Sequence, residues 1–331
     1  MNSRLLHVAL VFVSTTAALG ICGFLSYREG RATEPLVRFL DPRLTPSIDE
    51  AFVSFPVEYA LRSTEKNDVI FLGDSTCHDD VDPSTMALRS YNLSSLGSIG
   101  PLGILLTATA YLDHHPKPRV VVLCIYPLRF EVGSGSAGGH VIRRLIANYG
   151  PEVSGVVAPH EGIAYFIRRG ALTLGGRDEK GRAILDGPLR GMEAETFLTL
   201  QNKMSDTRGF FALPSEHGGR WTVETPAPKT FILPEWTDGI RRLASLCNRA
   251  GVPLVIRFAP IWDGVSKSRD FGLLDEWARG LEAAQPNVTV ARPIVLAFER
   301  RFMWDAFHLN AAGVEKFMPV VAKDVQSVLG K

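Results

Sequence analysis

The sequence has few cysteines and almost no net charge, and several common binding signatures are missing from it. Its 331 residues include four cysteines and carry a formal net charge of +1. Such a balance gives no general field that would attract nucleic acid or an anionic surface. Outside the apolar N-terminus, Cys77, Cys124 and Cys247 stand at no disulfide spacing. Zinc-finger spacing, a P-loop and a dinucleotide fingerprint are also absent. We therefore expect no nucleic-acid partner and no cofactor.

Two short clusters of histidine and aspartate have to be weighed as metal sites, because these residue types are the usual ligands. They are His78-Asp79-Asp80 and Asp113-His114-His115. Neither has a partner cluster at a recognisable spacing. The second follows an apolar helical stretch, Leu102 to Leu112, and is interpreted as a solvated helix end. No metal site is predicted.

An apolar stretch from Leu5 to Tyr27 contains no acidic or basic residue except His7. About 20 apolar residues are enough to span a bilayer. We interpret residues 1–28 as a transmembrane anchor; a cleaved secretory signal is the alternative, although the run is long for one. The arginines that follow it favour a cytoplasmic domain by the positive-inside rule, but long domains cross largely regardless of charge. The orientation therefore stays open at this point.

The rest of the chain is long enough for one large domain with a substantial core. Residues 29–64 are predicted to be a stalk and lead-in, irregular at first and then helical from Ala51 to Arg62. Residues 65–331 are predicted to form an α/β domain with an insertion at 130–225, which is interpreted as a lid or a substrate-binding cap. After the insertion, helices and strands alternate: Trp236–Ala250, Pro253–Phe258, Phe271–Ala284 and a last short strand, Val288–Ala291. This alternation predicts a parallel sheet with helices on both faces.

A candidate nucleophile follows the first strand of this domain. Val69 to Leu72 form an apolar run that breaks at Gly73 and is followed by Asp74 and Ser75. The run indicates a buried strand, and the carboxyl end of such a strand is where ligands bind in open α/β sheets. A serine held there can be a nucleophile. The alternative is that Asp74, Ser75 or Thr76 merely caps the next helix.

A candidate base lies near the C-terminus, in the turn from Asp305 to His308. A serine nucleophile needs a base, and the base needs a carboxylate that fixes its tautomer. Asn310 is predicted to be the N-cap of a last amphipathic helix, Ala311 to Leu329, which would fix this turn against the domain. A surface histidine before a helix is the alternative.

Gly73-Asp74-Ser75 together with Asp305-x-x-His308 before the last helix resembles the SGNH (GDSL-type) hydrolase superfamily. Within it, the apolar N-terminus and the form His308-Leu309-Asn310-x-x-Gly313 are similar to envelope acyltransferases: the alginate and cellulose O-acetylation proteins and the D-alanine transfer protein of teichoic acids. The resemblance covers about residues 65–130 and 235–331. It implies a three-layer α/β/α fold with a parallel central sheet, and ester chemistry in which Ser75 is the nucleophile, His308 the base and Asp305 the orienting acid.

The oxyanion-hole blocks of that superfamily match less well. The segment from Asn92 to Gly97 resembles the glycine block, and the backbone N–H groups of Ser75 and Gly97 are the expected oxyanion donors; Gly100 is a rival to Gly97. The third block should carry an asparagine, but Tyr126 stands in that region instead. Losing one oxyanion donor can cost on the order of 10²–10³ in rate. Either the two backbone donors suffice, another side chain substitutes, or the protein is a slow transferase or a non-catalytic relative.

The resemblance implies an envelope substrate, and we expect a membrane-anchored domain on the periplasmic or extracellular side. The predicted activity is acyl transfer, such as O-acetylation, to an envelope polysaccharide through an acyl-serine. A membrane-bound acyltransferase is a candidate partner. The alternatives are a carbohydrate esterase, secreted or anchored, and a non-catalytic glycan-binding member of a polysaccharide export complex. Asp74, Tyr126 and Trp262 are predicted to line the substrate pocket.

Overall fold

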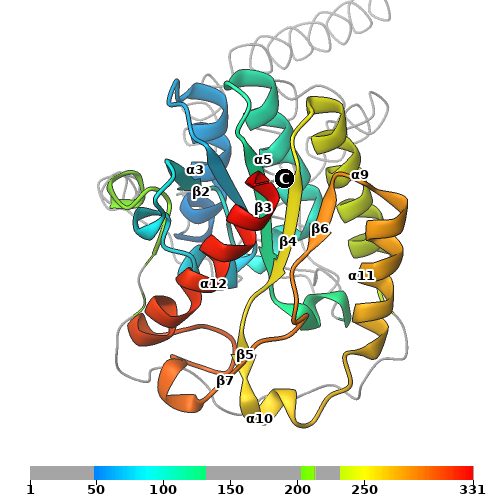
Figure 1. The fold of residues 1–331 in the computed structure, drawn as a ribbon. Coiled ribbons are helices and arrows are strands. Elements are labelled where there is room, and N and C mark those ends of the chain that lie inside the picture. Colours follow the sequence, from blue (N-terminus) through cyan, green and yellow to red (C-terminus); the bar gives the residue numbers. More distant parts are fainter. Residues whose placement is uncertain (1–47, 132–202, 212, 214–231, 331) are drawn as a thin grey trace, which may run out of the picture.

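The computed structural model describes residues 48–131, 203–211, 213 and 232–330. Within them, five parallel strands form one sheet in the order β2-β1-β3-β4-β6 (Figure 1). The strands are β1 Val69–Gly73, β2 Ser90–Asn92, β3 Val120–Ile125, β4 Leu254–Phe258 and β6 Val288–Val290. The predicted α/β class and parallel sheet are confirmed. The predicted anchor and stalk to residue 47, and most of the insertion, lie outside the described residues.

The central strands β1, β3 and β4 are short, mainly apolar runs that are buried on both faces. All six residues of β3 and all five of β4 are buried, as expected of parallel strands covered by helices on both sides. Neighbouring side chains point to opposite faces, so that Val121 and Leu123 pack into one apolar cluster and Val120 and Val122 into the other.

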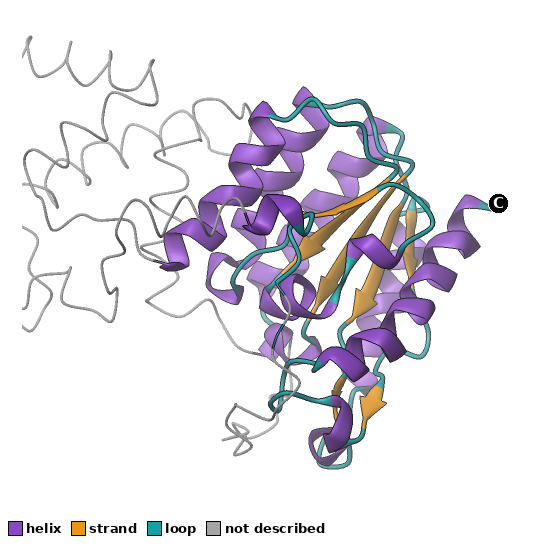
Figure 2. Ribbon diagram, turned by 90° about the vertical axis from the view of Figure 1, so that its left-hand side faces the viewer, coloured by secondary structure: helices purple, strands orange, loops and turns teal. Residues whose placement is uncertain are grey.

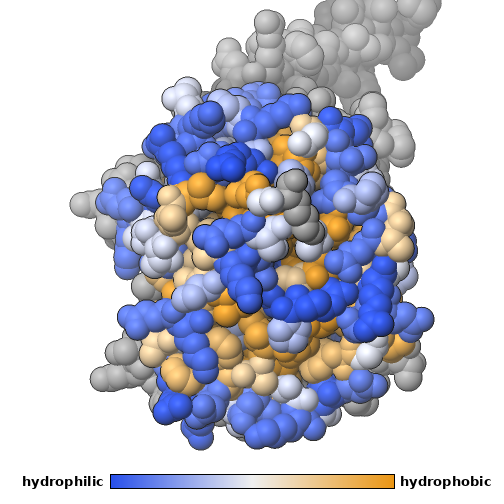
Figure 3. Space-filling model, in the orientation of Figure 1, coloured by the Kyte–Doolittle hydropathy of each residue, from blue (hydrophilic) through white to orange (hydrophobic). Residues whose placement is uncertain are grey.

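Helices cover both faces of the sheet (Figure 2). One cluster joins the sheet to α3 Ile48–Arg62, α5 Gly100–His114, α9 Pro234–Ala250 and α11 Gly272–Ala284. The opposite cluster joins it to α4 Ser75–Asp80 and α12 Ala311–Leu329. Figure 3 shows the face of the molecule that carries α12, where hydrophobic residues are visible beside hydrophilic ones. None of the helices in the described ranges is both long and apolar enough to cross a bilayer.

The predicted ends of two helices are confirmed. The Asn310 side chain caps α12 by accepting the Gly313 N–H at 3.0 Å. α9 ends at Gly251, whose φ of 71° lies in the left-handed region that glycine adopts most easily. The helix predicted for residues 51–62 is α3, which begins three residues earlier than expected and contributes Phe52, Val53 and Val57 to the core.

Two local predictions are correct only in part. The strand predicted at Val288–Ala291 is present as β6, but it is not the last one, because β7 Ala297–Phe298 pairs with β5 Ile261–Trp262 in a second, two-stranded parallel sheet. Asp113-His114-His115 is not wholly a solvated helix end, because His115 is only 7% exposed and its ring stacks on Tyr111. Strands of two residues show no periodicity, and Tyr59, the second ring that stacks on His115, lies 56 residues earlier and leaves no local signal.

The remaining elements are short helices in the connections between the strands and larger helices. They are the α-helix α10 Asp263–Ser266 and the short 3-10 helices η1 Pro83–Thr85, η2 Gly97–Ile99, η3 Pro127–Glu131 and η5 Arg300–Phe302. η2 and η3 follow the carboxyl ends of β2 and β3, and α4 follows that of β1. Residues 203–211, which belong to the predicted insertion, bond to the edge strand β2 through the Asn92 N–H, which donates to the Arg208 carbonyl at 2.9 Å.

Candidate active site

Ser75 is the first residue of α4, directly beyond the carboxyl end of β1. The chain passes close to β3 at this point, since a Cβ on Gly73 would lie 1.8 Å from the Cys124 carbonyl oxygen. Asp74 is the N-cap of α4, and its Oδ1 accepts the Thr76 N–H at 3.1 Å and the Thr76 hydroxyl at 2.5 Å. The strand, the glycine break and the capping residue together leave the Ser75 side chain half-buried at the edge of the sheet.

His308 is held in a turn that Asp305 organises. Asp305 Oδ1 accepts the backbone N–H groups of Phe307 and His308, each at 2.7 Å. The turn is closed by an antiparallel bridge between Met303 and Leu309, immediately before the capping residue of α12. The predicted attachment of this turn to the last helix is therefore present.

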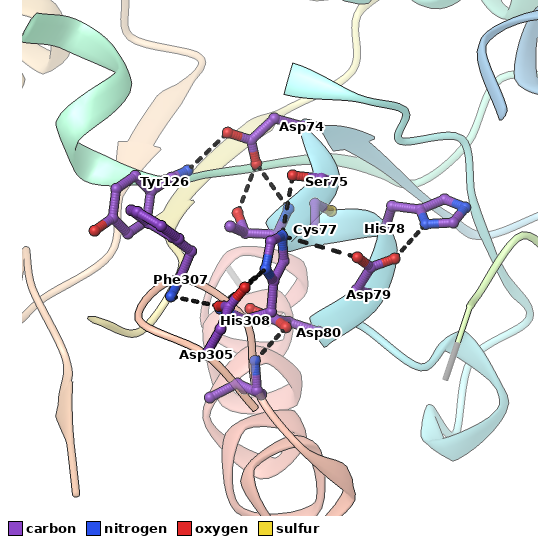
Figure 4. Close-up of polar contacts among 12 residues, drawn as sticks. Asp74, Ser75, Cys77, His78, Asp79, Asp80, Tyr126, Asp305, Phe307 and His308 are labelled. Carbon is purple, nitrogen blue, oxygen red and sulfur yellow. Dashed lines mark hydrogen bonds and ion pairs between the residues drawn. The ribbon is translucent and has the colours of Figure 1, made fainter. Parts of the chain in front are cut away.

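The two pieces of chain meet at the same edge of the sheet (Figure 4). His308 Nε2 lies 3.1 Å from Ser75 Oγ. On the other side of the ring, His308 Nδ1 lies 3.0 Å from Asp305 Oδ2 and 3.1 Å from Oδ1. If the ring proton is on Nδ1 it is donated to Asp305, and Nε2 is then free to accept the proton of the Ser75 hydroxyl. The arrangement can support nucleophilic catalysis by a serine.

Asp305 and His308 each stabilise the charged form of the other. Burial raises the pKa of Asp305, but its hydrogen bonds and the charge of His308 outweigh burial and lower that pKa below the ordinary 3.8. For His308, burial lowers the pKa, but the hydrogen bond to Asp305 and the negative charges of Asp80, Asp305 and Asp79 raise it from 6.5 to about 9. The imidazole is consequently protonated at neutral pH when no substrate is bound.

Two further carboxyl groups approach the same turn, and the sequence analysis assigned neither to this site. Asp80 is fully buried, and its Oδ1 accepts the Leu309 N–H at 2.8 Å. Burial raises the pKa of Asp80 well above its ordinary value. Asp79 Oδ2 lies 3.8 Å from His308 Nε2. Since Ser75 and Asp79 are four residues apart, a helix predicted to begin at the serine would have placed them on one face.

Asp74 does not line a pocket as predicted. It is 1% exposed, and its Oδ2 accepts the Tyr126 N–H at 3.3 Å and the Arg129 Nε–H at 3.0 Å. Its carboxylate therefore caps α4 and ties it to η3, which is close to the capping role weighed as an alternative.

Tyr126 and Trp262 lie among apolar residues beside the site. The Tyr126 ring meets the Phe307 ring edge-on at 5.2 Å, and its phenol oxygen points away from Ser75 (Figure 4). Tyr126 is 5% exposed and does not replace the missing oxyanion asparagine. Trp262 is half-buried and packs against the cluster that contains Tyr126. Tyr126 therefore exposes little surface to a substrate.

The two predicted oxyanion donors have free N–H groups. Among the described residues, neither the Ser75 nor the Gly97 backbone N–H has a hydrogen-bond acceptor outside its own helix. The Arg129 guanidinium lies on Gly97, because a Cβ there would be 2.0 Å from Arg129 Nη2. The rival, Gly100, has a φ of 56° and makes the turn into α5. Arg129, which the sequence analysis did not single out, thus lies between the buried Asp74 and the glycine block.

In the described ranges, no group of three or more histidine, cysteine, aspartate or glutamate residues is placed to hold a metal ion. Comparison of the chain with models of known protein families gives no match, and comparison with curated protein sequences gives no significant match. What can be said of its chemistry therefore depends on the residues and their geometry.

Proposed function

We propose that the protein is a serine-dependent acyltransferase of SGNH type that transfers an acetyl or similar acyl group to an envelope polysaccharide. The observation that carries the proposal is the continuous contact from Asp305 through His308 to Ser75 Oγ, at 3.0 Å and 3.1 Å, between segments 233 positions apart in sequence. Side chains so distant in sequence meet in an order that acyl transfer requires.

In the first half-reaction, Ser75 Oγ attacks the carbonyl carbon of an acyl ester or thioester-derived donor, and His308 Nε2 takes its proton. Asp305 stabilises the imidazolium, and the N–H groups of Ser75 and Gly97 bind the oxyanion. The tetrahedral intermediate then breaks its bond to the leaving group, which receives the proton from Nε2. The products are acyl-Ser75 and the protonated leaving group.

In the second half-reaction, a glycan hydroxyl gives its proton to His308 Nε2 and attacks the acyl carbon. The bond to Ser75 Oγ breaks, and Nε2 returns the proton to that oxygen. Water in place of the glycan gives hydrolysis, so that a carbohydrate esterase is the close alternative. The apolar stretch at residues 5–27 and the resemblance to envelope acyltransferases favour transfer. The domain would then lie on the periplasmic or extracellular side, where a membrane-bound acyltransferase is the candidate partner that supplies the acyl group.

A non-catalytic glycan-binding role in a polysaccharide export complex is the alternative that the missing oxyanion asparagine favours. Tyr126 stands in that region, and its phenol oxygen points away from Ser75 (Figure 4). In a protein of this kind, Ser75 would bind a glycan hydroxyl without forming an ester.

The test is rapid-mixing kinetics with an activated acetyl ester, followed by product analysis. The wild type should release a burst of about one leaving-group molecule per protein molecule, and Ser75→Ala should show no burst. Ser327→Ala, which removes an exposed hydroxyl on the last helix, is the matched control and should keep the burst. Acetylated oligosaccharide among the products identifies a transferase, acetate alone an esterase. A wild type without a burst refutes both catalytic functions.

A further inference from the structure

His308 Nε2 faces two oxygen atoms, and only one of them belongs to the serine. Ser75 Oγ is 3.1 Å away and Asp79 Oδ2 is 3.8 Å away. Both residues belong to α4 and lie one helical turn apart. Figure 4 shows the imidazole lying between the carboxylates of Asp305 and Asp79. Each ring nitrogen therefore lies near a carboxylate: Nε2 near Asp79 and Nδ1 near Asp305.

Asp79 is fixed in this place by a second imidazole. Its Oδ1 lies 2.5 Å from His78 Nδ1. The His78 side chain is only 4% exposed, and its ring packs edge-on against Phe52 at 5.1 Å and nearly parallel to Phe211 at 6.0 Å. Among the described residues, His78 Nε2 has no hydrogen-bond partner. The proton of this ring is thus best placed on Nδ1, where Asp79 accepts it.

Among the described residues, the charged groups that face His308 are all acidic. The titratable groups that face it are Asp305 from its own turn and Asp79 and Asp80 from α4, while His78 reaches it only through Asp79. The Trp304 and Phe307 rings lie edge-on to the imidazole. Asp79 is the most exposed of the three carboxyl side chains that surround the ring and the nearest to Nε2.

We propose that Asp79 is a positioning residue of this site, which sets the proton affinity of His308 Nε2, and that His78 holds Asp79 in place. The inference rests on the proposed function and adds a residue to it. Asp79 stabilises the imidazolium that forms when Ser75 loses its proton. It also raises the affinity of the resting imidazole for its proton, so that less of the neutral base is present at a given pH. These two effects oppose each other, and their balance changes with pH.

Replacing Asp79 by asparagine should therefore change the pH profile in a way that loss of packing cannot imitate. A unit charge at this distance shifts a proton-binding constant by about tenfold. With a Brønsted coefficient of about one half, Asp79→Asn should acylate about threefold faster well below pH 9 and about threefold slower above it. The two profiles should cross.

The experiment combines two measurements on the full chain. The first is the NMR titration of His308 in wild type, Asp79→Asn and Asp113→Asn; Asp113 is an exposed aspartate near the amino end of β3 and controls for net charge. The second is the pH profile of the acylation burst in the same proteins. Asp79→Asn should bind the imidazole proton about tenfold more weakly and show the crossing, and Asp113→Asn should show neither.

A second pair of variants tests the part that His78 plays. His78→Asn retains an N–H donor for Asp79, and His308 in this variant should titrate as in the wild type. His78→Phe removes the donor, and the proton affinity of His308 should then change in the same direction as in Asp79→Asn. A His308 proton affinity within about twofold of wild type in folded Asp79→Asn overturns the inference while leaving the burst, and the proposed function, intact. Conversely, a wild type with no burst overturns the proposed function, and the catalytic part of this inference with it, whatever the titration shows.

Discussion

Replacing Asp305 by asparagine separates the two tasks of this residue. Its Oδ1 accepts two backbone N–H groups, from Phe307 and His308, and its carboxylate accepts the imidazole Nδ1–H. The carbonyl oxygen of asparagine can still accept both backbone N–H groups. Its amide NH₂, however, faces Nδ1, which must then become an acceptor. The ring proton moves to Nε2, and Nε2 can no longer accept the proton of Ser75.

The expected loss of acylation rate is about 10⁴-fold, the size of effect that a reversed tautomer has in a serine–histidine–aspartate triad. This corresponds to about 5 kcal/mol of transition-state stabilisation. The pKa of His308 should fall from about 9, because the hydrogen bond and the charge of Asp305 both raise it. Asp305→Ala should also lose stability, since two backbone N–H groups lose their acceptor at about 1–3 kcal/mol for each that is left unpaired.

The assay is the burst rate with an activated acetyl ester, read beside urea unfolding of the same samples. Asp82→Asn is the matched control, because Asp82 also accepts a backbone N–H, from Ser84 at 2.9 Å, but lies beside no imidazole. It should keep the wild-type burst rate. An Asp305→Asn protein that is folded and acylates within about tenfold of wild type would refute the assigned role of Asp305.

Three further predictions concern stability and are checked by urea unfolding. Because the pKa of His308 is raised from 6.5 to about 9 in the folded chain, the imidazole contributes up to about 3 kcal/mol below pH 6.5 and loses it as the pH rises through 9; His308→Gln should flatten this fall, and an unchanged slope would contradict it. Asp80→Asn should change the free energy of unfolding by less than about 1 kcal/mol, since an amide oxygen can still accept the Leu309 N–H. Asp80→Ala removes this acceptor and should cost about 1–3 kcal/mol; equal losses in the two variants would contradict this role of Asp80. Arg257→Met should cost about 3–5 kcal/mol, because the buried guanidinium bonds to Asp324 at 2.7 Å, and the double variant with Asp324→Leu should recover most of it; no recovery would show that the charge pair is not the cause.

The regular parts of the fold could be predicted because their signals are local. Asn310 and the apolar spacing after it place both ends of α12, and the apolar run from Val69 marks β1. The second sheet could not be predicted, because β5 and β7 have two residues each and pair only through the tertiary fold. The burial of His115 depends likewise on Tyr59, which stacks on its ring from 56 residues earlier in the sequence.

Some residues of the candidate site could likewise be predicted from the sequence, and others could not. Ser75, Asp305 and His308 could be found from short motifs and from the expectation that both motifs lie at one edge of a sheet. Asp79 was instead considered as a metal ligand, because three adjacent polar residues do not reveal which of them faces the base. Asp74 was expected to line a pocket, although its carboxylate is occupied by Thr76, Tyr126 and Arg129 contacts that only the folded chain brings together.

The most direct measurement is peptide mapping by mass spectrometry after brief exposure of the full chain to an activated acetyl ester at pH 9. The acetyl group should be found as an ester on Ser75 in the wild type and nowhere in Ser75→Ala, and His308→Gln should reduce its formation to a background level. Acetyl groups scattered over surface side chains, with Ser75 unmodified in a folded wild type, would contradict the assignment of Ser75 as a nucleophile activated by His308.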